Sequence, residues 1–168
     1  MMSSEHKFAK RPLCIILLAT LFTSGFANAQ TQQTSQVQNL NLDGARAVLH
    51  AAEQMAGQLS APSSIAVVDA SGDLILFEQM QGARPIGIDL AIGKARSAAR
   101  YWESTQTLES TINTGRPAAI TAEMIQMNGG VPIRVGGIVV GAIGVSGLVT
   151  GNDIKIADAA AAAIKSGL

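Results

Sequence analysis

The chain has 168 residues, of which 48% are hydrophobic and 14% are charged, so it is long enough for one domain and too apolar for a disordered protein. Twelve basic and twelve acidic residues give a formal net charge of zero. This balance excludes the strong positive charge that nucleic-acid-binding proteins and proteins of anionic membrane surfaces carry.

The first 29 residues have the three parts of a secretory signal peptide. A basic segment at 7–11 precedes an apolar run at 13–22, which is too short to span a membrane well, and Ala27-Asn28-Ala29 is a small-x-small cleavage site. We therefore expect residues 1–29 to be removed on export, so that the mature protein is periplasmic or secreted. The only cysteine, Cys14, lies in this segment, so the mature protein would have no thiol and no disulfide.

The polar, uncharged segment that follows, residues 30–39 (QTQQTSQVQN), predicts a flexible leader, and residues 40–168 predict a folded domain. Without residues 1–29, the domain and its leader carry 9 basic and 11 acidic residues, a net charge of about −2 by direct count. We therefore expect no nucleic-acid partner, and no membrane partner after cleavage.

The domain begins with a predicted helix and a predicted hairpin. Residues 41–59 have the apolar spacing of an amphipathic helix, with Asn41 as its N-cap. Two β-rich runs, 64–69 and 74–80, flank the turn-type residues 70–73.

The middle of the chain predicts more helices and one further strand. Residues 86–102 form the longest predicted helix of the domain, and its apolar side ends at Trp102, which we expect to fill core rather than to flank a flat ligand. Residues 105–114 predict a short helix, and 116–122 predict a short turn or helix. Residues 123–127 are a candidate fifth strand.

A second hairpin is predicted with apolar strands at 132–135 and 138–145, joined by Gly136-Gly137, a turn that requires positive φ. The second of these strands has no polar side chain on either face, so we expect it to be covered on both sides. Glycine at Gly141 and Gly144 predicts close approach of a packed element.

A last helix is predicted over residues 153–165, with Asp153 near its start. The element order, with hairpins in place of β-α-β crossovers, predicts an α+β fold with a mainly antiparallel five-stranded sheet flanked by helices. Because the chain has only 4% aromatic residues, we expect the small domain to gain stability as a homo-oligomer.

Five separated features identify a resemblance to a known family. They are AVVDASGDLILF at 66–77, DLAIGKARSA at 89–98, GGVPI at 129–133, VGAIGVSG at 140–147, and Asp153. Together they resemble the GlcG/HbpS-like family, the haem-binding or "heme-degrading domain" group related to the C-terminal domain of PduO proteins. The resemblance covers about residues 40–167 and implies a profilin-like α/β/α sandwich that assembles into oligomers.

The resemblance makes His50 a candidate metal ligand. After loss of residues 1–29, His50 is the only histidine, and imidazole is a good axial ligand of haem iron. Family members that bind haem are thought to use a histidine on the first helix. The motif AAEQMA places Gln54 at that position, with His50 one turn earlier; the alternative is a surface histidine.

Three basic residues of the predicted helix 86–102 form a second candidate site. Lys94, Arg96 and Arg100 would hold carboxylates, such as haem propionates or a small organic acid. The alternative is a solvated face in which Asp89 pairs with these cations.

The turn at Ser146-Gly147 is a third candidate, because its backbone N–H groups and the following helix start would bind an anion. The alternative is a tight strand-to-helix connection capped by Asp153. The mature chain has too few histidines and cysteines for a zinc site with ordinary ligands.

The sequence thus leads to one preferred function and two alternatives. The preferred one is a secreted or periplasmic oligomeric protein that binds haem or a related tetrapyrrole, as the resemblance implies. The alternatives are an enzyme or binder for a small organic acid, and a structural or sensory accessory protein without its own ligand.

Overall fold

The computed structural model describes residues 37–164, so the expected signal peptide at 1–29 and most of the expected leader lie outside the described residues. The described elements, in chain order, are α1 (Leu42–Gln58), β1 (Ser64–Asp69), β2 (Leu74–Gln79), α2 (Gly87–Tyr101), α3 (Thr105–Thr114), the 3-10 helix η1 (Pro117–Ala122), β3 (Gly130–Val135), β4 (Ile138–Ser146) and α4 (Thr150–Ala161). No helix within residues 37–164 combines the length and apolar character that crossing a membrane requires.

The sheet has four strands in residues 37–164, in the order β2-β1-β4-β3, and every pair is antiparallel. The α+β fold and the antiparallel sheet are confirmed, but the fifth strand is wrong. Glu123 ends η1 in a left-handed conformation with φ 55°, and Gln126 donates its side-chain N–H to the carbonyl of Ala119 at 2.9 Å. The segment is therefore folded back on η1, and β3 remains an edge strand, where Pro132 is tolerated.

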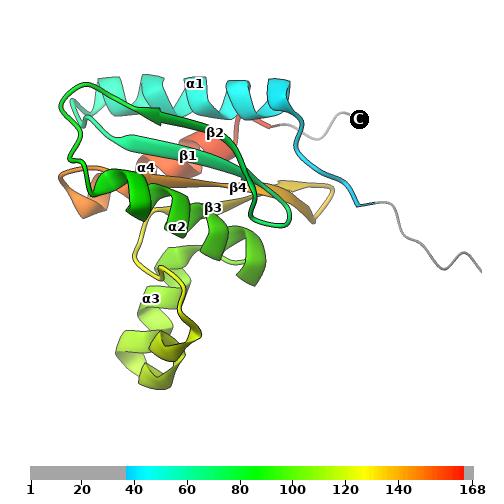
Figure 1. Ribbon diagram of the computed structural model, residues 1–168, viewed down its shortest axis with the longest axis vertical. Helices are drawn as coiled ribbons and strands as arrows, with labels where there is room; N and C mark the ends of the chain where they lie inside the picture. Colours follow the sequence, from blue (N-terminus) through cyan, green and yellow to red (C-terminus); the bar gives the residue numbers. More distant parts are fainter. Residues whose placement is uncertain (1–36, 165–168) are drawn as a thin grey trace, which may run out of the picture. The chain divides into compact units, whose positions relative to one another are not determined.

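Helices cover both faces of the sheet (Figure 1). One core, with α1 and α4 on the sheet, is built around Ile65, Val67, Ile143 and Val145. On the other face α2 lies against the sheet through a row of fully buried alanines, Ala91, Ala95, Ala98 and Ala99. The side chains of this row are small, so the backbone of α2 comes close to the sheet.

Strand β4 is central and, from Val140 to Ser146, buried as its composition predicts. The prediction is wrong for the start of the strand, where Ile138 is 54% exposed beside the hairpin turn. A Cβ at Gly144 would lie 2.1 Å from the carbonyl oxygen of Ala91 in α2, and a Cβ at Gly141 would lie 3.2 Å from Cβ of Leu40, which packs in the core of α1 and α4. Both hairpin glycines have positive φ, 57° at Gly136 and 84° at Gly137, as the turn requires.

A β-bulge changes the faces of β4 from those of a regular strand. The pairing with β3 skips Val140, because Ile133 pairs with Gly141 and Arg134 pairs with Val139. Val140 therefore packs in the same core as Ile143. Its carbonyl oxygen accepts from the backbone N–H of Leu40 at 2.7 Å.

The end of the expected leader is part of the fold. The side chain of Asn39 accepts from the backbone N–H of Ala70 at 3.0 Å, and the following Leu40 is 9% exposed. Asn41 caps α1 as predicted, since its side chain accepts from the N–H of Gly44 at 2.8 Å. The folded domain thus begins just before residue 40.

Candidate functional site

His50 lies on the outer surface of α1. Its Nε2 is 3.0 Å from Nε2 of Gln54, and its Nδ1 is 3.7 Å from Oε2 of Glu53. The side chain is 70% exposed. The histidine and Gln54 therefore share one exposed helix face that does not enclose a flat ligand.

A pair of carboxyl groups, Glu53 and Glu78, lies next to this histidine. A side-chain hydrogen bond with Glu53 raises the pKa of Glu78 on β2 above its ordinary value, and burial and repulsion from Glu53 raise it further. Within residues 37–164, no group of three or more His, Cys, Asp and Glu side chains is arranged to hold a metal ion.

Lys94 is separated from the arginines with which the sequence analysis grouped it. The side chain is 2% exposed, and Nζ donates to the carbonyl oxygen of Val145 and to Oδ2 of Asp153, each at 2.9 Å. A Cβ at Gly129 would lie 3.1 Å from this Nζ, so glycine there leaves room for the ammonium group. A lysine enclosed in this way holds α2 to the start of α4 and does not face a solvent-borne carboxylate.

The turn at Ser146-Gly147 already has an anion bound to it. Oδ1 of Asp153 accepts from the N–H of Gly147 at 2.9 Å, and Ser146 is 6% exposed. The carboxylate of Asp153 therefore bridges this N–H and the ammonium of Lys94. The alternative of a tight connection held by Asp153 describes this turn better than an external anion site.

Arg96 and Arg100 extend from α2 to the turn between β1 and β2. Nε of Arg96 donates to the carbonyl oxygen of Gly72 at 3.3 Å, and Nε of Arg100 donates to that of Ser71 at 3.0 Å. Both arginines are exposed, and Asp89 is not their partner. Lys94 instead binds Val145 and Asp153, so the three cations do not form one site.

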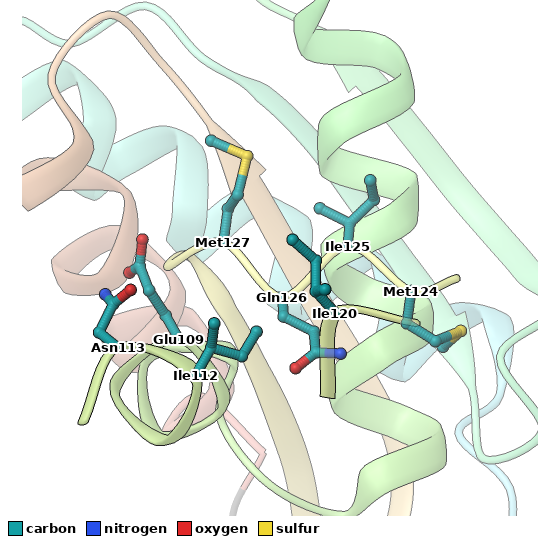
Figure 2. A pocket seen from close by; sticks show the side chains of 8 residues that line it. All are labelled: Glu109, Ile112, Asn113, Ile120, Met124, Ile125, Gln126 and Met127. Atoms are coloured by element: carbon teal, nitrogen blue, oxygen red, sulfur yellow. The ribbon is translucent and has the colours of Figure 1, made fainter. Parts of the chain in front are cut away.

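An apolar pocket lies in a part of the chain that the sequence analysis did not single out as a site. Figure 1 shows α3 and η1 extending away from the sheet beyond the end of α2. The pocket between them has a volume of about 260 Å³ and is lined by Glu109, Ile112, Asn113, Ile120, Met124, Ile125, Gln126 and Met127. Figure 2 shows these side chains around it, with Glu109, Ile112 and Asn113 of α3 on one side and Ile125 and Met124 on the other.

The walls of this α3 pocket are anchored to the rest of the domain. A Cβ at Gly93 of α2 would lie 2.3 Å from Cγ1 of Ile125, so the isoleucine fits directly over this glycine. Oε2 of Glu109 accepts from the backbone N–H of Asn128 at 3.2 Å. The signal in the sequence is the apolar character of residues 123–127, which predicts a strand and instead forms a wall of the pocket.

Comparisons with known proteins identify the family of the chain. A family model described as "Haem degrading protein HbpS-like" matches residues 40–162. Protein GlcG of Escherichia coli is 38% identical over 103 residues, which make up 61% of this chain and 77% of that protein.

Solved structures share the fold. A double mutant of HbpS from Streptomyces reticuli has 29% identity and a TM-score of 0.72, covering 80% of this chain and 92% of that chain. The crystal structure of a PduOC:heme complex has 27% identity and a TM-score of 0.67, covering 75% of this chain and 95% of that chain.

Proposed function

The chain belongs to the HbpS-like family of haem degrading proteins, and from this membership we propose that it binds haem or a related tetrapyrrole. The apolar α3 pocket, whose lining includes the thioethers of Met124 and Met127, is the observation that supports a binding site for this ligand. A relative of the same fold, PduOC, has been crystallised as a complex with heme. We assign the tetrapyrrole to the α3 pocket and not to His50.

The residues of the α3 pocket fit an apolar, flat ligand. Isoleucine side chains at 112, 120 and 125 offer aliphatic contacts for a porphyrin face, and thioether sulfur is an axial ligand that haem iron accepts. The volume of about 260 Å³ is below the ~300–1,000 Å³ of most small-molecule sites. The pocket would therefore hold one edge of the tetrapyrrole and leave the other edge outside.

The negative charge of Glu109 determines which edge of the tetrapyrrole would enter the α3 pocket. Glu109 is the acidic residue of the lining, and a carboxylate there repels haem propionates. The vinyl- and methyl-bearing edge would then face Ile112 and Ile120, while the propionates point toward solvent. Bound haem iron would supply ligand binding or redox chemistry, and the apolar walls would limit the access of water to it.

Haemin titration of the purified protein tests the proposal, with the Soret band as the readout. We expect a shifted band in the parent and in His50→Ala, and a different band position in the double variant Met124→Leu/Met127→Leu. Met80→Leu is the matched control, because Met80 is half-buried against the core that α1 and α4 form on the sheet and does not line the α3 pocket. Absence of a Soret shift in the parent would contradict haem binding.

A second pair of variants tests the location of the site. Ile120 is 70% exposed in the α3 pocket and Ile86 is 55% exposed at the start of α2, so aspartate at either position leaves the core intact. We expect Ile120→Asp to weaken haemin binding at least tenfold and Ile86→Asp to leave it unchanged. Loss of the Soret shift in His50→Ala, with Ile120→Asp unchanged, would return the site to α1.

We also propose that the protein is exported, from the signal-peptide pattern of residues 1–29. N-terminal sequencing of the protein recovered from the periplasm or the medium tests this. A mature N-terminus at Gln30 is expected, and an intact Met1 in the cytoplasm contradicts it.

Self-association is proposed from exposed apolar side chains near one end of the sheet. Ile86, Leu148 and Val149 are 55%, 54% and 58% exposed, and Arg84 donates to the carbonyl oxygen of Gly147 at 3.2 Å, which brings their two loops together. We expect light scattering to show an oligomer that Leu148→Glu shifts toward monomer. A monomeric parent at micromolar concentration would contradict this.

A further inference from the structure

A second cavity, separate from the α3 pocket, lies where α2 ends beside two hairpin turns. It has a volume of about 410 Å³, and its lining includes Ser71, Trp102, Arg134, Ile138 and Val139. Figure 1 shows the end of α2, the β1–β2 turn and the β3–β4 turn at the same end of the sheet. None of these residues belongs to the haem site proposed above.

Trp102 presents its indole to this cavity instead of filling core. The residue is 66% exposed and adopts a left-handed conformation with φ 56°, which is uncommon for a bulky residue. Arg134 holds it there, since Nη2 donates to the carbonyl oxygen of Trp102 and Nη1 donates to that of Gly137 at 3.1 Å. The expectation that Trp102 is a core residue is wrong.

One guanidinium group, that of Arg134, lines the cavity together with the indole, and a second, that of Arg100, is bonded to Ser71 of the lining. Arg134 uses two of its five N–H donors in the bonds to carbonyls, and Arg100 uses Nε in its bond to Ser71, which lines the same cavity. A Cβ at Gly72 would lie 3.0 Å from Nε of Arg100, so glycine lets the guanidinium lie against the turn. Within residues 37–164, no carboxylate lies within 4.0 Å of either guanidinium.

The combination of an exposed indole, aliphatic walls and uncompensated guanidinium groups suits one class of ligand. The face of an indole stacks on flat apolar groups, and guanidinium binds carboxylate in a bidentate manner. We propose that this cavity binds a small planar carboxylate, with the ring over Trp102 and Ile138 and the carboxylate on Arg134 and Arg100. A neutral ligand of the same shape would leave the guanidinium groups without an anion.

The chain provides its own probe, because Trp102 is the only tryptophan. Titration of the haem-free protein with 4-nitrobenzoate, excited at the indole and corrected for absorption by the ligand, reports binding at this cavity directly. 4-Nitrobenzamide is the matched neutral ligand. We expect saturable quenching by the carboxylate and at least tenfold weaker binding of the amide.

Substitutions of single arginines test which side chains bind the carboxylate of the ligand. Arg134→Gln and Arg100→Gln should each weaken binding of 4-nitrobenzoate at least tenfold. Arg46→Gln should not change it, because Arg46 lies on α1 and pairs with Asp43 at 3.0 Å. Arg100→Gln leaves the bond from Arg134 to Trp102 in place, so it tests the charge without releasing the indole.

Three results would overturn the proposal. They are quenching without saturation, equal affinity for the acid and the amide, and equal losses in Arg46→Gln and Arg100→Gln. Because haem is absent throughout, failure here leaves the haem proposal intact, and failure of the Soret titration leaves this site intact.

Discussion

Helix α2 leaves no room for a side chain at Gly144 of β4, and replacing this residue with alanine should destabilise the domain strongly. The new Cβ would lie 2.1 Å from the carbonyl oxygen of Ala91 and 2.5 Å from the backbone nitrogen of Ala95. Ordinary contacts begin at 3.4 Å, so α2 would have to move. Because backbone atoms cannot rotate away as a side-chain end does, and because the interior is close-packed, the shift would be roughly 1 Å.

This movement would open the packing of α2 against Ala66, Val68 and Ala142 on the same face of the sheet. Overpacked cores typically lose ~1–3 kcal/mol, and we expect the upper end, about 3 kcal/mol, because two backbone atoms are involved. Total stability of such a domain is about 5–15 kcal/mol. At roughly 4 °C per kcal/mol for a domain of this size, the melting temperature should fall by about 12 °C.

Thermal denaturation followed by circular dichroism measures this, with Gly57→Ala as the control. Gly57 is an exposed residue of α1 with no atom within 4 Å of a Cβ, so alanine there should stabilise the helix by about 0.5–1 kcal/mol. If Gly144→Ala melts within about 2 °C of the parent while Gly57→Ala rises, the close packing of α2 on β4 is refuted.

Two further predictions concern ionisable groups. Lys94→Met leaves the buried carboxylate of Asp153 without its cation and should lower the free energy of unfolding by about 3–5 kcal/mol. The double variant Lys94→Met/Asp153→Leu should lose less than the sum of the two single changes. Additive losses, measured by urea unfolding, would contradict the coupling. The raised pKa of Glu78 means that the unfolded state loses its proton first as the pH rises, so the folded state binds more protons and stability falls from about pH 4.5 up to the raised pKa. Glu78→Gln should keep the hydrogen bond to Glu53 and reduce this fall, which melting temperatures between pH 4 and 7 measure; an unchanged pH profile would exclude Glu78 as its source.

Local chemistry explains why most elements were predictable from the sequence. The Gly136-Gly137 turn requires positive φ at both residues, and Asn41 can cap a helix whatever the helix packs on. The segment 123–127 was predicted wrongly because a short apolar run has the same composition in a strand and in a loop that covers a helix. Its side chains pack on Gly93 and η1, which no local pattern indicates.

The candidate sites were harder to predict because each depends on residues far apart in the chain. The α3 pocket combines α3, η1 and the loop after it, and the cavity beside Trp102 needs Arg134, which the sequence analysis does not single out. His50 stays a prediction as a metal ligand, and its exposure on α1 followed only from the packing of that helix.

The family, the α+β class, the two hairpins and the two-sided burial of β4 were determined by the sequence alone, because apolar periodicity, turn residues and motif order are properties of neighbouring residues. Only the tertiary structure determined which partner each charged side chain has. Lys94 and Arg96 are two residues apart on one helix, yet the ammonium of Lys94 is buried on Asp153, 59 residues away in sequence, while Arg96 reaches the β1–β2 turn. Residues two apart on a helix point in different directions, and only the folded chain determines whether a direction leads to a carboxylate, a carbonyl or water.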